Sequence, residues 1–175
     1  VRVCDCCYDL IDEKLKIIDE KDKKQPPQRT QGWYETRYNL LSASSLGKCF
    51  STPSNYNKLI YDKCSPLDTS KYNSININSS LHWGQKYEPI SQSYYEYKYN
   101  TTIREYGCII HSKYEFIGAS PDGINIKREH ENYGRMLEIK NIVSREITGI
   151  PKQDYWIQMQ IQMECCDLDE CDFLE

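Results

Sequence analysis

The stretch GASPDGINIKREHENYGRMLEIKN, residues 118–141, decides how this sequence is interpreted. It contains an acid after a proline, Asp122, and then, beyond a polar loop, an acid and an amine two residues apart, Glu138 and Lys140. In a strand, alternate side chains share a face, so Glu138 and Lys140 point the same way while the apolar residues beside them point to the core.

The linker between the two apolar segments predicts that these groups meet. Its eight residues, 127–134, let the strand carrying Asp122 turn back beside the strand carrying Glu138. Mg²⁺ binds carboxylate and carbonyl oxygens together with waters, and in that setting it prepares a water for attack on phosphorus. The pattern therefore suits phosphodiester hydrolysis. It also suits a simple turn at Asp122 and a surface ion pair between Glu138 and Lys140, and spacing alone leaves both interpretations open.

The composition predicts an intracellular, soluble protein with one main domain. The chain has 175 residues, of which 39% are hydrophobic and 27% charged, and its net charge of −4 excludes a wholly basic coat for nucleic acid. No run approaches the roughly 18 apolar residues that cross a bilayer, and no signal peptide is visible, so no membrane partner is expected. The nine cysteines are an odd number, and most are expected to be reduced thiols.

The order of charged, breaker and apolar segments predicts an α/β domain behind a short N-terminal arm. Residues 9–30 predict a charged, solvated helix or linker, the stretch "QPPQRTQGW" at 25–33 breaks any helix there, and the main domain is expected over 31–175. A surface excursion is expected at 51–80, and a helix over 81–99 interrupted at Pro89. Three apolar runs are expected to form antiparallel strands, at 104–112, 114–127 and 135–143.

The segment 154–164 contains conflicting signals. Ile and Met alternate with Gln from Ile157 to Met163, and this period of two favours a strand. Asp154 as a helix cap and the abundance of good helix formers favour a helix instead.

Four sequence blocks in order resemble the YqaJ-like viral recombinase family, which includes phage lambda exonuclease and lies within the PD-(D/E)xK nuclease superfamily. "SPDG" and "LEIKN", with Asp122, Glu138 and Lys140, are similar to its core motif. The others are W-x-x-x-R followed by S-A-S from Trp33, "WGQKYEP" with Glu88, and "YWIQMQIQM" with Gln158. The resemblance covers about residues 33–175. It implies a restriction-endonuclease-like core with a mixed central sheet flanked by helices, and it implies a helix at 154–164.

The resemblance also implies roles for individual residues. Asp122, Glu138, the Ile139 carbonyl and Glu88 would bind Mg²⁺, or alternatively Mn²⁺. Lys140 would act on the nucleophile, and Gln158 would position Lys140 or a metal-bound water. Three residues would bind the 5′ phosphate of the digested strand: Arg37, Ser44 and Ser120.

The activity that the resemblance implies is a metal-dependent 5′-to-3′ exonuclease for duplex DNA with free ends. The alternatives are a structure-specific endonuclease of the same superfamily and a non-catalytic module that binds DNA or assists assembly. A ring-shaped homo-oligomer, a single-strand annealing protein as partner and a virus-infected host cell as location are the corresponding expectations.

Both ends of the sequence suggest neighbouring segments. Residues 1–8, "VRVCDCCY", resemble the closing part of a FYVE-type zinc finger, in which Cys4 and Cys7 would be the last ligand pair. Four ligands are needed and the other pair has no counterpart here, so zinc is not expected. The domain is expected to be incomplete after "CDFLE", and buried reduced thiols are expected at Cys165, Cys166 and Cys171.

Overall fold

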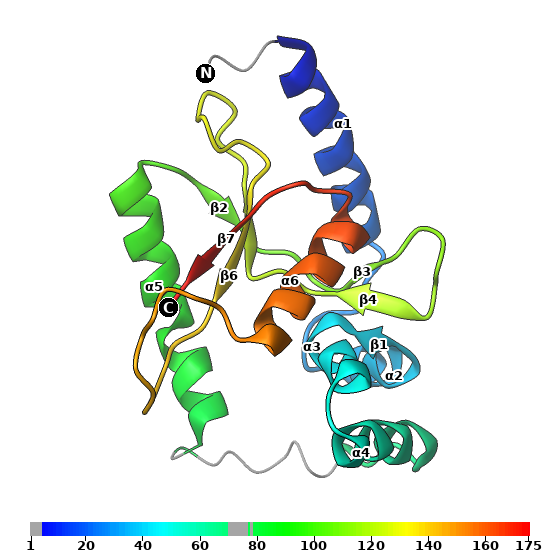
Figure 1. The fold of residues 1–175 in the computed structure, drawn as a ribbon. Helices are drawn as coiled ribbons and strands as arrows, with labels where there is room; N and C mark the ends of the chain where they lie inside the picture. The colour runs from blue at the N-terminus through cyan, green and yellow to red at the C-terminus, as the bar shows by residue number, and fades with distance from the viewer. Residues whose placement is uncertain (1–4, 70–76, 78) are drawn as a thin grey trace.

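The computed structural model describes residues 5–69, 77 and 79–175, and Figure 1 shows their arrangement. The helices are α1 (Asp5–Asp22), α2 (Gln31–Asn39), α3 (Ala43–Leu46), the 3₁₀ helix η1 (Gly47–Phe50), α4 (Pro53–Cys64), α5 (Ser80–Tyr99) and α6 (Gln153–Cys166). The strands are β1 (Leu41–Ser42), β2 (Ile103–Arg104), β3 (Ile109–Ile110), β4 (Ile117–Ala119), β5 (Gly123–Asn125), β6 (Met136–Ile139) and β7 (Cys171–Leu174). Within these ranges, no helix has the length and apolar character needed to span a bilayer.

The strands form two mixed sheets, which confirms the α/β class with mixed strand pairing and divides the expected central sheet in two. One sheet has the order β1-β4-β3 and the other β2-β5-β6-β7, and each contains parallel and antiparallel pairs. The hairpin expected between the two halves of the core motif is confirmed, because β5 and β6 pair antiparallel with Gly123 opposite Leu137. A Cβ on Gly123 would lie 2.1 Å from Cγ2 of Ile103, so glycine lets β2 lie close at this point.

The two faces of β6 belong to different parts of the core. Met136 packs in a cluster with Ile124, Ile18 and Cys166, so this face looks toward α1 and α6. Leu137 and Ile139 alternate with it and pack with residues of α5 and β2. Figure 1 shows α5 and α6 on opposite sides of the four-stranded sheet. Because both faces are covered, a charged side chain on β6 is buried and needs a partner.

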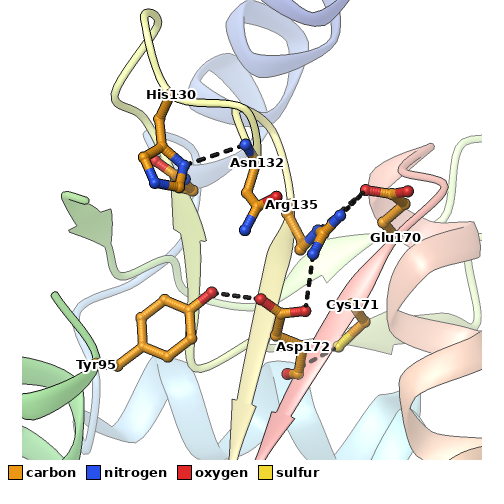
Figure 2. Close-up of polar contacts among 8 residues, drawn as sticks. Tyr95, His130, Asn132, Arg135, Glu170, Cys171 and Asp172 are labelled. Carbon is orange, nitrogen blue, oxygen red and sulfur yellow. Dashed lines mark hydrogen bonds and ion pairs between the residues drawn. The ribbon is translucent and has the colours of Figure 1, made fainter. Parts of the chain in front are cut away.

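Cys171–Leu174 form β7, which pairs parallel with β6. Asp172 fixes this strand to its neighbours, because its carboxylate accepts a hydrogen bond of 2.5 Å from the Tyr95 hydroxyl of α5 and one of 3.2 Å from Arg135. Arg135 also donates to Glu170, as Figure 2 shows. The strand is therefore tied to both α5 and the start of β6.

Helix α1 is less solvated than its charge density predicts. Leu15 and Ile18 are 8% and 2% exposed and belong to the main core cluster. Asp22 accepts the backbone N–H of Gly107 at 2.7 Å, and Asp19 pairs with Arg104 at 2.9 Å. Two apolar residues three positions apart suffice to dock the helix, so residues 5–22 pack on the main domain. Cys4 lies outside the described residues, and the origin of residues 1–8 in a zinc finger stays a prediction.

Residues 51–99 contain more helix than the sequence predicted. Within the surface excursion expected at 51–80, residues 53–64 form helix α4, because Thr52 accepts the Asn55 N–H and Pro53 begins the first turn. Residues 70–76 and 78 of that range lie outside the described residues. Helix α5 continues through Pro89, so Glu88 lies in mid-helix rather than at a break. An exposed proline loses one backbone hydrogen bond, and the contacts of the buried face hold the helix together.

The segment expected as one strand over 114–127 is two strands in different sheets. It leaves the three-stranded sheet after Ala119 and enters the other at Gly123. Pro121 lies between them and has no N–H for a sheet ladder, which explains the break. The turn places Asp122 at the junction between the two sheets.

Residues 153–166 form helix α6, so the strand alternative and the cap at Asp154 are both wrong. The N-cap is Lys152, and Asp154 lies in the first turn, where an acid favours the helix dipole. The period of two misleads because two of the glutamines, Gln158 and Gln162, are not surface residues. They lie four positions apart and therefore on one face of the helix.

Candidate active site

Strand β6 places Glu138 at the centre of a buried polar cluster. Its side chain is fully buried. Oε1 pairs with the ammonium of Lys140 and accepts a hydrogen bond of 2.6 Å from Gln158 Nε2, while Oε2 accepts one of 2.8 Å from Gln162 Nε2. Both carboxylate oxygens thus have donors, which is what an anion in a covered sheet requires. The surface ion pair considered for Glu138 and Lys140 is excluded by this burial.

Asp122 lies across the hairpin from Glu138. The register of β5 and β6 sets these two positions opposite each other, and Asp122 Oδ2 accepts the Ile139 N–H at 2.7 Å. Burial and the nearby charge of Glu138 raise the pKa of Asp122 to about 7. The pair of acids therefore resists carrying two negative charges unless a cation compensates them.

Lys140 is held as a cation. Burial alone would lower its pKa, but the charge of Glu138 and the hydrogen bond to it outweigh that effect, so the pKa is raised. Its ammonium also lies 5.4 Å from the ring centroid of Tyr155 on α6, within the range of a cation–π contact. Lys140 can therefore donate hydrogen bonds at neutral pH and cannot accept a proton there.

Glu88 enters the same groove from α5. The groove has a volume of about 510 Å³ and is lined by Glu88, Asp122, Ile139 and Lys140, among others. Burial, together with the charges of Glu105 and Glu138, raises the pKa of Glu88. An acid from a separate helix thus shares one cavity with Asp122, Ile139 and Lys140 of the hairpin.

Asn141 joins the helix to the strand in this groove. Its Oδ1 accepts a hydrogen bond of 2.6 Å from Ser91, and its Nδ2 donates one of 3.1 Å to the Gly84 carbonyl. Ser91 and Gly84 flank Glu88 on α5. Asn141 therefore fixes the position of Glu88 relative to the end of β6, a role that the "LEIKN" motif did not suggest when it was interpreted from the sequence.

Gln162 is the second residue that the sequence interpretation missed. It is 0% exposed, and its Nε2 donates to Glu138 and, at 3.0 Å, to the Ser120 carbonyl. It thus links the carboxylate of Glu138 to the turn that carries Asp122. The only signal in the sequence was its spacing of four from Gln158, which places two amides on one helical face. Gln158 itself contacts Glu138 rather than Lys140.

The three residues predicted to bind phosphate lie beside this turn. Arg37, on α2, donates to the Ser120 hydroxyl at 3.2 Å, and its guanidinium lies 4.9 Å from the centroid of the Trp33 ring. Ser44 is exposed on α3, which packs against β4, and its hydroxyl shares a hydrogen bond with Ser42. The structure therefore joins Arg37 to Ser120 and leaves Ser44 open to solvent on the neighbouring helix.

Asp122 and Glu138 are hard oxygen donors of the kind that Mg²⁺ binds. Among the described residues, no three His, Cys, Asp or Glu side chains form a ready-made metal cluster. Mg²⁺ commonly takes one or two carboxylates and completes its shell with waters and substrate phosphates. Asp122 and Glu138 supply such a pair, and the raised pKa of Asp122 marks a site short of positive charge.

Three cysteines of α6 and β7 are protected thiols. Cys165 and Cys166 are buried, and burial raises the pKa of each to about 12. Cys171 is partly buried, and its pKa is raised to about 12 for the same reason. These three are reduced, as the sequence predicted.

A model of the YqaJ-like viral recombinase domain matches residues 32–169 of this chain. The chain belongs to the YqaJ-like viral recombinase family. An uncharacterised protein of Acanthamoeba polyphaga mimivirus is 33% identical to it over 179 aligned positions, which cover 93% of this chain and 31% of that protein. The YqaJ-like chain therefore spans about a third of the length of this relative.

Solved structures show the same fold. The alkaline exonuclease LHK-Exo from Laribacter hongkongensis matches with a TM-score of 0.63 and 27% identity, over 82% of this chain and 72% of that one. The same enzyme in complex with dAMP matches with a TM-score of 0.60 and 26% identity, over the same shares. The YqaJ-like chain thus has the PD-(D/E)xK fold expected from its core motif.

Proposed function

We propose that this YqaJ-like domain is a divalent-metal-dependent deoxyribonuclease that degrades duplex DNA from the 5′ end. The observation that carries the proposal is that Asp122 and Lys140 line one groove. Both are adjacent to the buried Glu138, whose two carboxylate oxygens accept from Lys140, Gln158 and Gln162. Family membership and the likeness to an alkaline exonuclease support the same reaction class.

Asp122 and Glu138 would hold Mg²⁺ or Mn²⁺, with the Ile139 carbonyl and Glu88 as further ligands. The bound cation would supply a water of lowered pKa and neutralise charge on the phosphate. Gln158 and Gln162 would keep the Glu138 carboxylate in place, as partners behind a metal ligand commonly do.

Lys140 would act as a hydrogen-bond donor and a positive charge. Because its pKa is raised, it stays protonated while charge builds on the phosphate oxygens. It would donate to the attacking water or to a phosphate oxygen and would not serve as the base.

Arg37, with Ser120 and Ser44, would bind the 5′ phosphate of the digested strand. Arginine suits this task because its planar guanidinium donates two parallel hydrogen bonds to a phosphate. Anchored there, the strand would present its first internucleotide bond to the groove. In hydrolysis a water oxygen joins phosphorus, the bond from phosphorus to the 3′ oxygen breaks, and that oxygen takes a proton, releasing a 5′ mononucleotide.

The test compares linear and closed circular duplex DNA, in Mg²⁺ and in EDTA. We expect Mg²⁺-dependent release of mononucleotides from linear duplexes labelled at the 5′ end, with no cutting of circles. Lys140→Ala should reduce the rate about 100-fold, because it removes charge stabilisation in the transition state. Lys113→Ala, a change of the same type on the β3–β4 turn, should leave the rate unchanged.

Other outcomes identify the alternatives. Cutting of closed circles would replace the exonuclease with a structure-specific endonuclease. Binding of DNA without cleavage in either metal would indicate a non-catalytic module. Cleavage that Lys140→Ala leaves unchanged would overturn the role of Lys140. The ring assembly and the annealing partner stay predictions, which light scattering and pull-down with purified annealing protein would test.

A further inference from the structure

Helix α5 carries a row of large side chains that takes no part in the groove. Trp83, Tyr87, Ile90, Tyr94 and Tyr97 follow one another at spacings of four, three, four and three, which places them along one flank of the helix. We call this row the α5 stripe. Four of its five members are exposed: Trp83 by 41%, Ile90 by 62%, Tyr94 by 56% and Tyr97 by 87%.

The stripe is bordered by positive charge. Lys86 lies 5.2 Å from the Tyr87 ring centroid, and Lys98 lies 5.9 Å from that of Tyr94. The two acids of α5 turn elsewhere, because Glu88 lines the groove and Glu96 accepts the Ile103 N–H at 2.7 Å. In a chain of net charge −4 this flank is thus aromatic and cationic.

The opposite side of α5 is held firmly against the sheet. The Tyr95 hydroxyl donates to Asp172 of β7, as Figure 2 shows, and Ser91 donates to Asn141 at the end of β6. Figure 1 places α5 at the edge of the molecule. The stripe therefore stands at a fixed position relative to Glu88, on the same helix.

We propose that the α5 stripe binds single-stranded DNA, with bases stacked on its aromatic rings and phosphates near Lys86 and Lys98. Aromatic side chains interleaved with cations bind single strands in this way without regard to sequence. The proposal rests on the proposed function, which leaves a single strand beside the groove when the partner strand is digested.

A partner helix fits the same spacing less well. Seams between helices use mostly aliphatic side chains and are flanked by charges of both signs. Four of the five residues of the stripe are aromatic, and its bordering charges are both lysines. The aromatic and cationic side chains of the α5 stripe therefore favour single-stranded DNA, with its phosphates and stacking bases, over an apolar helix.

The test measures binding of fluorescein-labelled oligothymidylate by anisotropy, in EDTA so that no cleavage occurs. Tyr94→Leu/Tyr97→Leu keeps an apolar surface but removes two π faces, and it should weaken binding at least about tenfold. Tyr94→Phe/Tyr97→Phe keeps the rings and should bind as the wild type does. The matched control is Tyr114→Leu/Phe116→Leu, which changes two exposed aromatic residues on the β3–β4 turn and should also leave binding unchanged.

Charge is tested separately. Lys86→Gln/Lys98→Gln should lower the slope of log affinity against log salt by about 0.7 for each phosphate that the variant no longer neutralises. An unchanged slope together with unchanged affinity in the Leu variant would overturn the proposal.

Two further readouts separate this proposal from its rivals. If light scattering shows that the Leu variant loses self-association while its DNA affinity is unchanged, the stripe is a contact between copies and the proposal fails. Because binding is measured without metal, loss of affinity in the Leu variant supports the stripe even if no nuclease activity is found. Cleavage by the wild type with wild-type affinity in the Leu variant supports the nuclease and refutes the stripe.

Discussion

The turn that joins the two sheets has a cation on one side and carboxylates on the other. The three-stranded sheet leads to Ser120, which binds the half-buried Arg37. The four-stranded sheet begins after Asp122, whose neighbour Glu138 is fully buried. The carboxylates are enclosed by donors, whereas the guanidinium remains partly open. This difference suits the proposed function, in which the carboxylates would hold a small cation and Arg37 would receive a DNA end.

The largest effect is expected at the carboxylate end. Asp122→Asn should reduce cleavage of every substrate by about 1,000-fold or more, because it removes one of two acids for the metal. The same change should raise the melting temperature in EDTA at pH 8 by a few degrees. At that pH the wild-type Asp122 is ionised although burial and the charge of Glu138 disfavour its charged form, and the neutral asparagine avoids this cost. Gel assays and calorimetry on the same preparation check both. An inactive variant that is also less stable would point to misfolding instead.

The sequence predicts the carboxylate side of the turn only where the spacing of its residues matches the secondary structure that they form. The alternation of Glu138 and Lys140 and the short linker before them specify the hairpin, because a strand admits only one face for both. Gln162 gave no such signal. Its alternation with apolar residues suggested a strand, and only the helix places it against Glu138 and Ser120.

The errors elsewhere share a physical cause. Charges around Leu15 and Ile18 concealed a docking face of two residues, since sparse apolar positions suffice when a large core is nearby. The start of α4 was marked by Thr52 and Pro53, a cap and first-turn pair, but the polar composition after it hid the signal. Local composition predicts burial poorly wherever tertiary contacts decide it.

A second prediction concerns the cationic end. Arg37→Gln should slow digestion of duplexes with a 5′ phosphate by about thirtyfold, the loss expected for a charge-assisted hydrogen bond, and should leave 5′-hydroxyl duplexes nearly unaffected. Arg128→Gln, on the surface near α1, is the matched control. The measurement is the ratio of initial rates on the two substrates. Equal slowing of both would show that Arg37 supports the fold or the whole strand rather than the end.

A third prediction concerns the link between the two ends. Gln162→Leu keeps the size of the side chain but removes the donor shared by Glu138 and the Ser120 carbonyl. We expect the rate to fall about tenfold and the Mg²⁺ concentration for half-maximal activity to rise by a similar factor, as for other residues that position metal ligands. Gln160→Leu, at an exposed position of the same helix, should change neither. A lower rate with unchanged Mg²⁺ dependence would mean that Gln162 only supports packing.

The smallest effect is a pH dependence of stability that Asp122 creates in the metal-free protein. Its pKa is about 7 in the folded protein and 3.8 when unfolded, so between these values the folded state holds a proton that the unfolded state lacks. Stability in EDTA should therefore fall as pH rises from about 4 to about 7 and change little above that range.

Other groups titrate over the same range, and the comparison with Asp122→Asn removes them. The difference in melting temperature between variant and wild type should grow from pH 5 to pH 7.5, and saturating Mg²⁺ should shrink it, because a bound cation stabilises the ionised carboxylate that the variant lacks. Differential scanning fluorimetry in matched buffers gives this difference directly. Parallel curves in EDTA would show that Asp122 ionises as freely in the fold as in water, and the two acids would then not share one enclosed site.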